Sequence, residues 1–222
     1  MAALFDRFLS ITLTAASVTL AATLVYRTVR EPDRPGTNLV DRAATKHADW
    51  EALIEQGITI HGDSTARLTL LEFADLECPA CREFHKVMND FIADNGSRVR
   101  VVYLAFPLPS HRFAMPAARA VECASKVGRA SEFIDAVYAR QDSLGLKPWG
   151  EYAAAAGITD TTLISNCART TKAFTRIDSS VAIAGNRRFI GTPTILINGW
   201  QMPTIPTRRG LDSALTVLDP RP

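Results

Sequence analysis

Two cysteines separated by two residues, in the segment Cys78-Pro79-Ala80-Cys81, are the residues whose types and spacing most directly suggest chemistry. Thiols at this spacing can form and break a disulfide with each other, so the pair can act as a reversible two-electron redox centre. The thiolate is the attacking species in such an exchange. The sequence therefore predicts thiol–disulfide exchange at Cys78 and Cys81.

The elements around the pair place it between a strand and a helix. Residues 66–73 are an apolar run rich in strand formers, and residues 79–95 carry apolar residues at helical spacing before Gly96. Unpaired backbone N–H groups at a helix N-terminus favour a negative charge, so we expect the pKa of Cys78 to lie below that of a free thiol. Cys81, one turn further, is then the less exposed resolving thiol.

Two other interpretations of the pair are half of a zinc site and a plain structural disulfide. A zinc site needs a second Cys-X-X-Cys pair or two histidines at ligand spacing, and neither Cys123 nor Cys167 belongs to one. We therefore expect no metal. The charge of Glu77 opposes a Cys78 thiolate, and His85 is expected to pack or cap within the helix.

Composition excludes several classes of function. The 222 residues carry a net charge of +2 without a block of basic residues, and no glycine-rich phosphate loop is present. We expect neither a nucleic acid nor a nucleotide as partner. The length is sufficient for one large domain.

The N-terminal region differs in character from the rest. Residues 8–26 are uncharged, which predicts a membrane anchor or signal segment over residues 1–27, followed by a polar linker over 28–45. An uncleaved anchor is favoured, and a cleaved signal peptide is the alternative. The flanking arginines argue for a cytoplasmic C-terminus. Disulfide chemistry belongs to an oxidising compartment, so we place the domain outside the cytoplasm.

The remaining pattern predicts a βαβ unit, a helical block and a ββα unit. The predicted strands are residues 98–107, 193–198 and 200–205; the predicted helices are residues 46–56, 112–125, 130–142, 149–156, two between 161 and 188, and 208–218.

The segments LLEFADLECPAC, VVYLAFPL and GTPTILING, in this order, resemble the DsbA-like thiol:disulfide oxidoreductases of the thioredoxin superfamily. The resemblance implies an α/β thioredoxin fold over residues 46–220. An all-helical insertion at about 108–188 would interrupt it, and the N-terminal membrane segment would precede it.

The resemblance also implies further site residues. The Thr192–Pro193 bond would be cis and lie beside the cysteines, with the Thr192 main chain presenting the substrate backbone, whereas sequence alone indicates an ordinary strand-start proline. Glu72 would lie buried beneath the disulfide and relay the proton of Cys81. The alternative for Glu72 is a strand-end carboxylate that faces solvent.

The other two cysteines, Cys123 and Cys167, both fall on predicted helices of the insertion. If Cys78 and Cys81 pair with each other, these two can form a structural disulfide, which similar proteins often carry. The alternative is two buried free cysteines that behave as small hydrophobic residues.

Together these features predict an extracytoplasmic thiol:disulfide oxidoreductase acting as an oxidase. A disulfide reductase or isomerase and a copper or zinc chaperone are the alternatives. No cofactor beyond the Cys78–Cys81 disulfide is expected. The expected partners are reduced or misoxidised extracytoplasmic proteins and a membrane redox partner. The expected location is the bacterial cell envelope, anchored in the cytoplasmic (inner) membrane, or the periplasm if the segment is cleaved.

Overall fold

The computed structural model describes residues 45–218. The predicted membrane segment over residues 1–27 and all but the last residue of the predicted linker lie outside the described residues. Within residues 45–218, no helix combines the length and the apolar character needed to cross a bilayer.

The described chain forms one six-stranded mixed sheet, whose strands lie in the order β1-β6-β5-β3-β4-β2. Strand β3 pairs in parallel with β4 and antiparallel with β5, so β3 is central. The strands are β1 (Thr45–Lys46), β2 (Ile58–His61), β3 (Leu68–Ala74), β4 (Val99–Ala105), β5 (Thr194–Ile197) and β6 (Trp200–Gln201).

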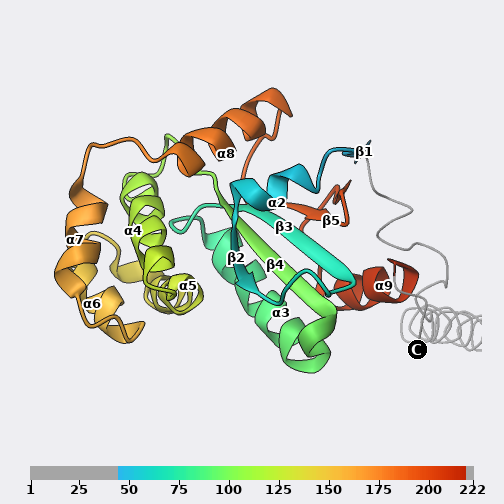
Figure 1. The fold of residues 1–222 in the computed structure, drawn as a ribbon, viewed down its shortest axis with the longest axis horizontal. Helices are drawn as coiled ribbons and strands as arrows, with labels where there is room; N and C mark the ends of the chain where they lie inside the picture. Colours follow the sequence, from blue (N-terminus) through green and yellow to red (C-terminus); the bar gives the residue numbers. More distant parts are fainter. Residues whose placement is uncertain (1–44, 219–222) are drawn as a thin grey trace, which may run out of the picture. The chain divides into compact units, whose positions relative to one another are not determined.

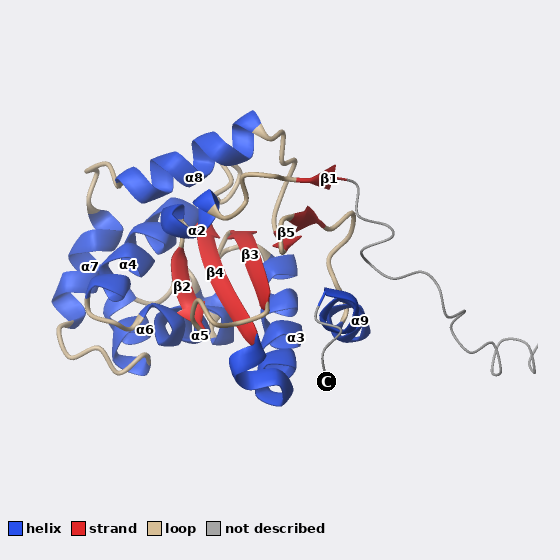
Figure 2. Cartoon of the chain, turned by 45° about the vertical axis from the view of Figure 1, so that its right-hand side comes forward, coloured by secondary structure: helices blue, strands red, loops and turns tan. Residues whose placement is uncertain are grey.

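Helices lie on both faces of the sheet and beyond one side of it (Figures 1 and 2). Helices α3 and α9 pack on one face, and α2 and α8 pack on the other. The helices are α2 (Ala52–Gln56), α3 (Pro79–Asn95), α4 (Ala114–Lys126), α5 (Ala130–Ala139), α6 (Trp149–Ala155), α7 (Thr161–Arg169), α8 (Thr175–Asn186) and α9 (Arg208–Leu218).

The central strand β3 is a nearly continuous apolar run because both of its faces are covered by helices. Leu70 packs against the α3 and α9 side, and its neighbour Leu71 packs against the α2 and α8 side. Because both faces are covered, every residue of β3 is buried, and alternating polar residues are absent from it. Glu72 is the charged exception.

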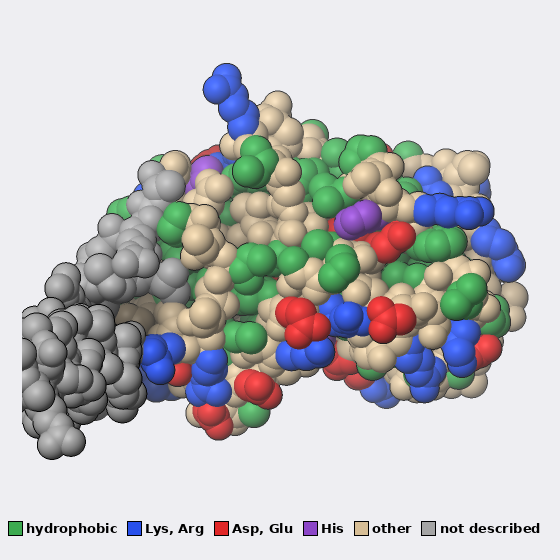
Figure 3. All heavy atoms as spheres, turned by 180° about the vertical axis from the view of Figure 1, so that it is seen from behind, with side chains coloured by type: hydrophobic (Ala, Val, Ile, Leu, Met, Phe, Trp, Pro, Cys, Tyr) green, Lys and Arg blue, Asp and Glu red, His purple; other side chains and the backbone are tan. Residues whose placement is uncertain are grey.

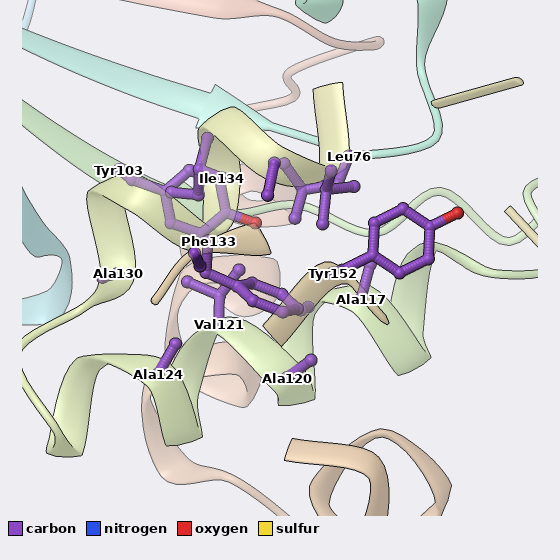
Figure 4. Close-up of a cluster of buried hydrophobic side chains, with 14 of the residues drawn as sticks. Leu76, Tyr103, Ala117, Ala120, Val121, Ala124, Ala130, Phe133, Ile134 and Tyr152 are labelled. Carbon is purple, nitrogen blue, oxygen red and sulfur yellow. The ribbon is translucent and has the colours of Figure 1, made fainter. Parts of the chain in front are cut away.

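Helices α4 to α8 lie between β4 and β5 in the chain, and α4 to α7 form a second layer of packing. Figure 4 shows its core, in which Val121 of α4 and Phe133 of α5 pack with Leu76 and Tyr103 from the sheet side. This shared core fixes the helical insertion against the end of the sheet where β3 leads into α3.

Most predicted elements are confirmed, and the prediction for α3 matches at both ends. The helix predicted over residues 46–56 is wrong in part, because this segment holds β1, a turn and only five residues of helix. The strand predicted over residues 200–205 stops at Gln201. Pro203 and Pro206 follow, and neither has an N–H group to continue a ladder. Strands β1 and β2 were not predicted.

Candidate redox site

Cys78 lies at the N-cap of α3, with Pro79 as the first helical residue. Its own N–H donates to the Asp75 carbonyl oxygen, which closes the turn between β3 and α3. Pro79 suits this position because its fixed φ is helical and its missing N–H would be unpaired there. Both Cys78 and Cys81 are free thiols in the structure, and both are buried.

The two thiols differ strongly in acidity. A hydrogen bond from the Cys81 thiol is the largest influence on Cys78, and it lowers the pKa of Cys78 to about 5, helped by the N–H groups of Cys81 and Ala80 and opposed by burial. Burial is the largest influence on Cys81 and raises its pKa far above the ordinary value. These shifts favour a thiolate at Cys78 and a protonated thiol at Cys81.

The loop before β5 meets Cys78 from the other side. The Thr192–Pro193 peptide bond is cis, and the Cys78 Sγ atom lies 3.4 Å from the Thr192 carbonyl oxygen. That oxygen accepts from the thiol and so favours the protonated form. The Thr192 hydroxyl is buried and makes no hydrogen bond among the described residues, so it is available to turn its proton toward a Cys78 thiolate. The Thr192 side chain accordingly lowers the pKa of Cys78. The net effect is a pKa of about 5 for Cys78, which favours the thiolate form at neutral pH.

Glu72 lies on β3, on the strand face that α3 covers, and is only 2% exposed. Burial, and secondarily the charge of Cys78, raises the pKa of Glu72 to about 8. The Glu72 Oε1 atom has no hydrogen-bond partner among residues 45–218. The solvent-facing alternative for Glu72 is therefore wrong, and the carboxyl group can carry a proton at neutral pH.

Asp75 organises the turn before Cys78 and was not singled out in the sequence. Its buried carboxylate accepts hydrogen bonds from the N–H groups of Glu77 and Leu108 and lies 2.7 Å from His111 Nδ1. Burial is the largest single influence and lowers the pKa of His111, but the bond to Asp75 and the negative charges of Asp75, Glu77 and Cys78 together outweigh it, so the net direction is upward. Asp75 could have been recognised in the sequence as a polar residue that directly follows a buried strand.

Gln141 is a second residue of this turn that was not predicted from the sequence. Its side-chain amide nitrogen lies 2.9 Å from the carbonyl oxygens of Leu76 and of Cys78, on either side of Glu77. The Glu77 carboxylate in turn accepts a hydrogen bond from the Phe113 N–H. Hydrogen bonds from the insertion therefore hold Leu76, Glu77 and Cys78, the three consecutive residues that lead into α3. No local sequence pattern marks Gln141 for this role.

Cys123 of α4 and Cys167 of α7 form a disulfide, with their Cα atoms 6.4 Å apart. The alternative of two buried free cysteines is therefore wrong. The bridge lies in the insertion and is separate from the Cys78–Cys81 pair. Within the described part of the chain, no group of three or more His, Cys, Asp or Glu side chains is arranged to hold a metal ion.

A β3–α3–β4 unit followed by β5, β6 and α9, with a cysteine pair opposite a cis-proline, defines a thioredoxin fold that carries a helical insertion. A family model described as Thioredoxin matches residues 55–216. The chain belongs to this family, and its fold is DsbA-like.

Three solved structures illustrate the similarity. A thioredoxin-like oxidoreductase from Silicibacter pomeroyi has a TM-score of 0.65 at 22% identity and covers 79% of this chain and 99% of its own. The thiol-disulfide exchange protein alpha-DsbA2 from Wolbachia pipientis has a TM-score of 0.66 at 14% identity, with coverages of 81% and 97%. DsbA2 from Pseudomonas aeruginosa has a TM-score of 0.53 at 28% identity, with coverages of 72% and 93%.

Curated relatives match over part of their length. The Na⁺/H⁺ antiporter NhaA 1 of Mycolicibacterium gilvum is 32% identical over 143 residues, which are 63% of this chain and 23% of the antiporter. NhaA 3 of Salinispora tropica is 31% identical over 141 residues, which are 63% and 21%. The chain thus spans less than a quarter of the length of these relatives, and ion transport is not carried over to it.

Proposed function

We propose that this chain is a thiol:disulfide oxidoreductase that exchanges disulfides with protein substrates outside the cytoplasm, acting as an oxidase. One observation carries the proposal: Cys78 is a buried helix N-cap thiol whose pKa is lowered to about 5, and its sulfur faces the cis Thr192–Pro193 bond. A structural disulfide needs neither an acidic thiol nor this contact.

The reaction transfers one disulfide. A substrate thiolate attacks the Cys78 sulfur of the Cys78–Cys81 disulfide, so a substrate–Cys78 bond forms and the bond to Cys81 breaks. Cys81 leaves as a thiolate and takes the Glu72 proton, because its own pKa is raised far above that of Glu72. A second substrate thiolate then attacks the substrate sulfur and releases Cys78 as a thiolate. The substrate loses two electrons and the cysteine pair gains them.

The Thr192–Pro193 loop would position the substrate. The Thr192 carbonyl oxygen lies beside the Cys78 sulfur. A polypeptide that adds its backbone to this loop would place its own sulfur within reach of Cys78, in the manner of strand addition. Glu72 and Cys81 are more deeply buried than Cys78. We assign proton transfer to Glu72 and the role of resolving thiol to Cys81.

The acidity of Cys78 supports exchange in the oxidising direction. A stabilised thiolate favours the reduced enzyme, which makes the disulfide form a better oxidant. The cysteine pair itself carries both electrons, so no further cofactor is required. A membrane redox partner would restore the disulfide. The uncharged stretch at residues 8–26 supports attachment to a bacterial cytoplasmic membrane, or export if it is cleaved.

The deciding experiment equilibrates the full chain in glutathione buffers and follows the oxidation state of Cys78 and Cys81 by mass spectrometry after alkylation. An oxidase should give a potential less negative than about −180 mV, whereas a thioredoxin-like reductant lies near about −270 mV. The same protein should oxidise a reduced unfolded substrate, and Cys78→Ser should not. Stoichiometric copper or zinc binding without catalysis would overturn the proposal.

A further inference from the structure

The Asp75 carboxylate joins the loop between β4 and α4 to the turn before Cys78. It accepts a hydrogen bond of 2.9 Å from the Leu108 N–H and lies 2.7 Å from His111 Nδ1. The His111 N–H donates to the Leu108 carbonyl oxygen, so both residues belong to one turn of this loop. The reaction proposed above uses neither Asp75 nor His111.

The backbone of Asp75 reaches both redox cysteines. Its carbonyl oxygen accepts the Cys78 N–H at 3.1 Å. Burial is the largest influence on Cys81 and raises its pKa, and the Asp75 N–H, as a hydrogen-bond partner, acts in the opposite direction. The Asp75 side chain also accepts the Glu77 N–H at 2.8 Å. The contacts that hold the Asp75 side chain therefore also hold the backbone that positions both sulfur atoms.

His111 is the partner of Asp75 that can carry a positive charge. The Asp75 side chain has no exposed surface, whereas the His111 side chain is 24% exposed. A buried carboxylate is destabilising unless hydrogen bonds and an opposite charge compensate it. Because a carboxylate only accepts, His111 Nδ1 donates to it, and the proton that titrates is the one on Nε2. The partial exposure of the ring lets this proton exchange with water.

The negative groups that face His111 favour its charged form. Burial lowers the pKa of His111 and is the largest single influence. The hydrogen bond to Asp75 and the charge of Asp75 raise it, as do the charges of Glu77 and Cys78, and the net direction is upward. The charged ring is therefore populated near neutral pH.

Two further titratable residues lie near this pair and keep one charge state. Arg112, the neighbour of His111 in the loop, lies over the Phe113 ring, with its guanidinium carbon 5.4 Å from the ring centroid. Tyr103 lies on β4, and burial first and then the charge of Asp75 raise its pKa, so its hydroxyl stays neutral. A change of charge near neutral pH is thus expected at His111.

We propose that His111 is a positioning residue of the redox site: its charged ring compensates the buried Asp75 carboxylate, holds the turn that carries Cys78 and so favours the Cys78 thiolate. This inference rests on the proposed function, in which Cys78 is released as a thiolate when the second substrate thiolate attacks. Without the charge of His111, the Asp75 carboxylate would oppose that thiolate. The coupling is reciprocal, so His111 should lose its proton more readily when Cys78 is in a disulfide.

The first test needs only the wild-type full chain. The His111 ring is titrated by ¹H–¹⁵N NMR in the reduced protein and in the protein with a Cys78–Cys81 disulfide. The pKa of His111 should be higher in the reduced protein by about 0.5, the order expected for one charge several ångström away at a partly solvated site. A purely structural histidine would titrate alike in both redox forms, and that result would overturn the proposal.

The second test separates the charge of His111 from its hydrogen bond. His111→Asn keeps a neutral N–H donor for Asp75, and His111→Ala removes donor and charge. The rate of Cys78 alkylation by iodoacetamide, followed against pH, reports the pKa of Cys78. Both variants should raise this pKa by about one pH unit, the low end of the effect of a nearby charge. Neither should have a further effect in an Asp75→Asn background, because His111 acts through Asp75.

His61→Asn is the matched control, because the His61 ring bonds the Gly96 carbonyl oxygen at the other end of α3. It should leave the pKa of Cys78 unchanged. An unchanged pKa of Cys78 in His111→Asn, or an equal effect of His111→Ala with and without Asp75→Asn, would overturn the positioning role alone. A wild-type protein that catalyses no exchange would overturn the proposed function itself.

Discussion

The side-chain amide of Gln141 donates a hydrogen bond of 2.9 Å to the carbonyl oxygen of Cys78, so a residue of the helical insertion holds the backbone of the proposed nucleophile. The insertion is therefore part of the site and not only a cover beside it.

Acidic and basic side chains are interspersed on the face of the molecule shown in Figure 3, which agrees with the low net charge.

Replacing Gln141 with leucine should destabilise the protein by about 2 kcal/mol, because the buried Leu76 carbonyl oxygen loses the Gln141 donor. The Cys78 carbonyl oxygen keeps its bond from the Arg82 N–H. Denaturant unfolding measures the difference. Asp142→Asn is the control, since its side chain is 89% exposed and its ion pair with Arg82 is worth at most about 1 kcal/mol. Equal stability of the two variants would contradict the role of Gln141.

Thr192→Val should raise the pKa of Cys78 above about 5, because the variant lacks the hydroxyl that favours the thiolate. Ultraviolet thiolate absorbance, followed against pH in the reduced protein, gives this pKa directly. Thr194→Val is the matched control, because the Thr194 hydroxyl donates to the Gly191 carbonyl oxygen. An unchanged pKa in Thr192→Val would show that the helix terminus and Cys81 act alone.

Glu72 and Cys78 should give opposite pH dependences of stability. The pKa of Glu72 is raised from 4.5 to about 8, so the folded state keeps a proton that the unfolded state loses. Stability from this group falls between these values, by about 1.4 kcal/mol per pH unit. The pKa of Cys78 is lowered from 9.0 to about 5, so the unfolded state holds the extra proton and stability rises with pH.

Unfolding of the reduced protein between pH 5 and 8 separates these two groups, whose pKa values bound that window. The free energy of unfolding should rise with pH in Glu72→Gln and fall in Cys78→Ser, and wild type should lie between them. The same slope in both variants would contradict the assigned pKa directions.

Removing the second disulfide should loosen the insertion. The bridge joins positions 44 residues apart, so the Cys123→Ala/Cys167→Ala variant should lose on the order of 3–4 kcal/mol of stability. Denaturant unfolding of the oxidised proteins measures this loss. Non-reducing peptide mapping of the wild type provides the control, and free thiols at both positions there would refute the bridge.

Local patterns predicted the elements that local residues define. Pro79 begins α3 and Gly96 follows its last residue, and the prediction for this helix needed nothing from elsewhere in the chain. The cysteine pair is equally local, whereas the cis geometry of the bond before Pro193 and the burial of Glu72 came from the family resemblance.

The features that were missed depend on partners far away in sequence. Strand β2 is a four-residue edge strand recognisable only by its pairing with β4. Gln141 donates hydrogen bonds to carbonyl groups 63 and 65 residues away. No short window of sequence contains both members of such a pair.

The contact between Cys78 and Thr192 spans 114 residues. The acidity of the proposed nucleophile therefore depends on how much of the chain has been made and folded. A ribosome makes Cys78 long before Thr192, and the N–H groups of α3 and the hydroxyl of Thr192 act together only once β5 has joined the sheet. Until then only the groups of its own helix, Cys81 first among them, lower the pKa of Cys78, and the contribution of Thr192 is missing. The full acidity of the proposed nucleophile is therefore reached only when the sheet is complete.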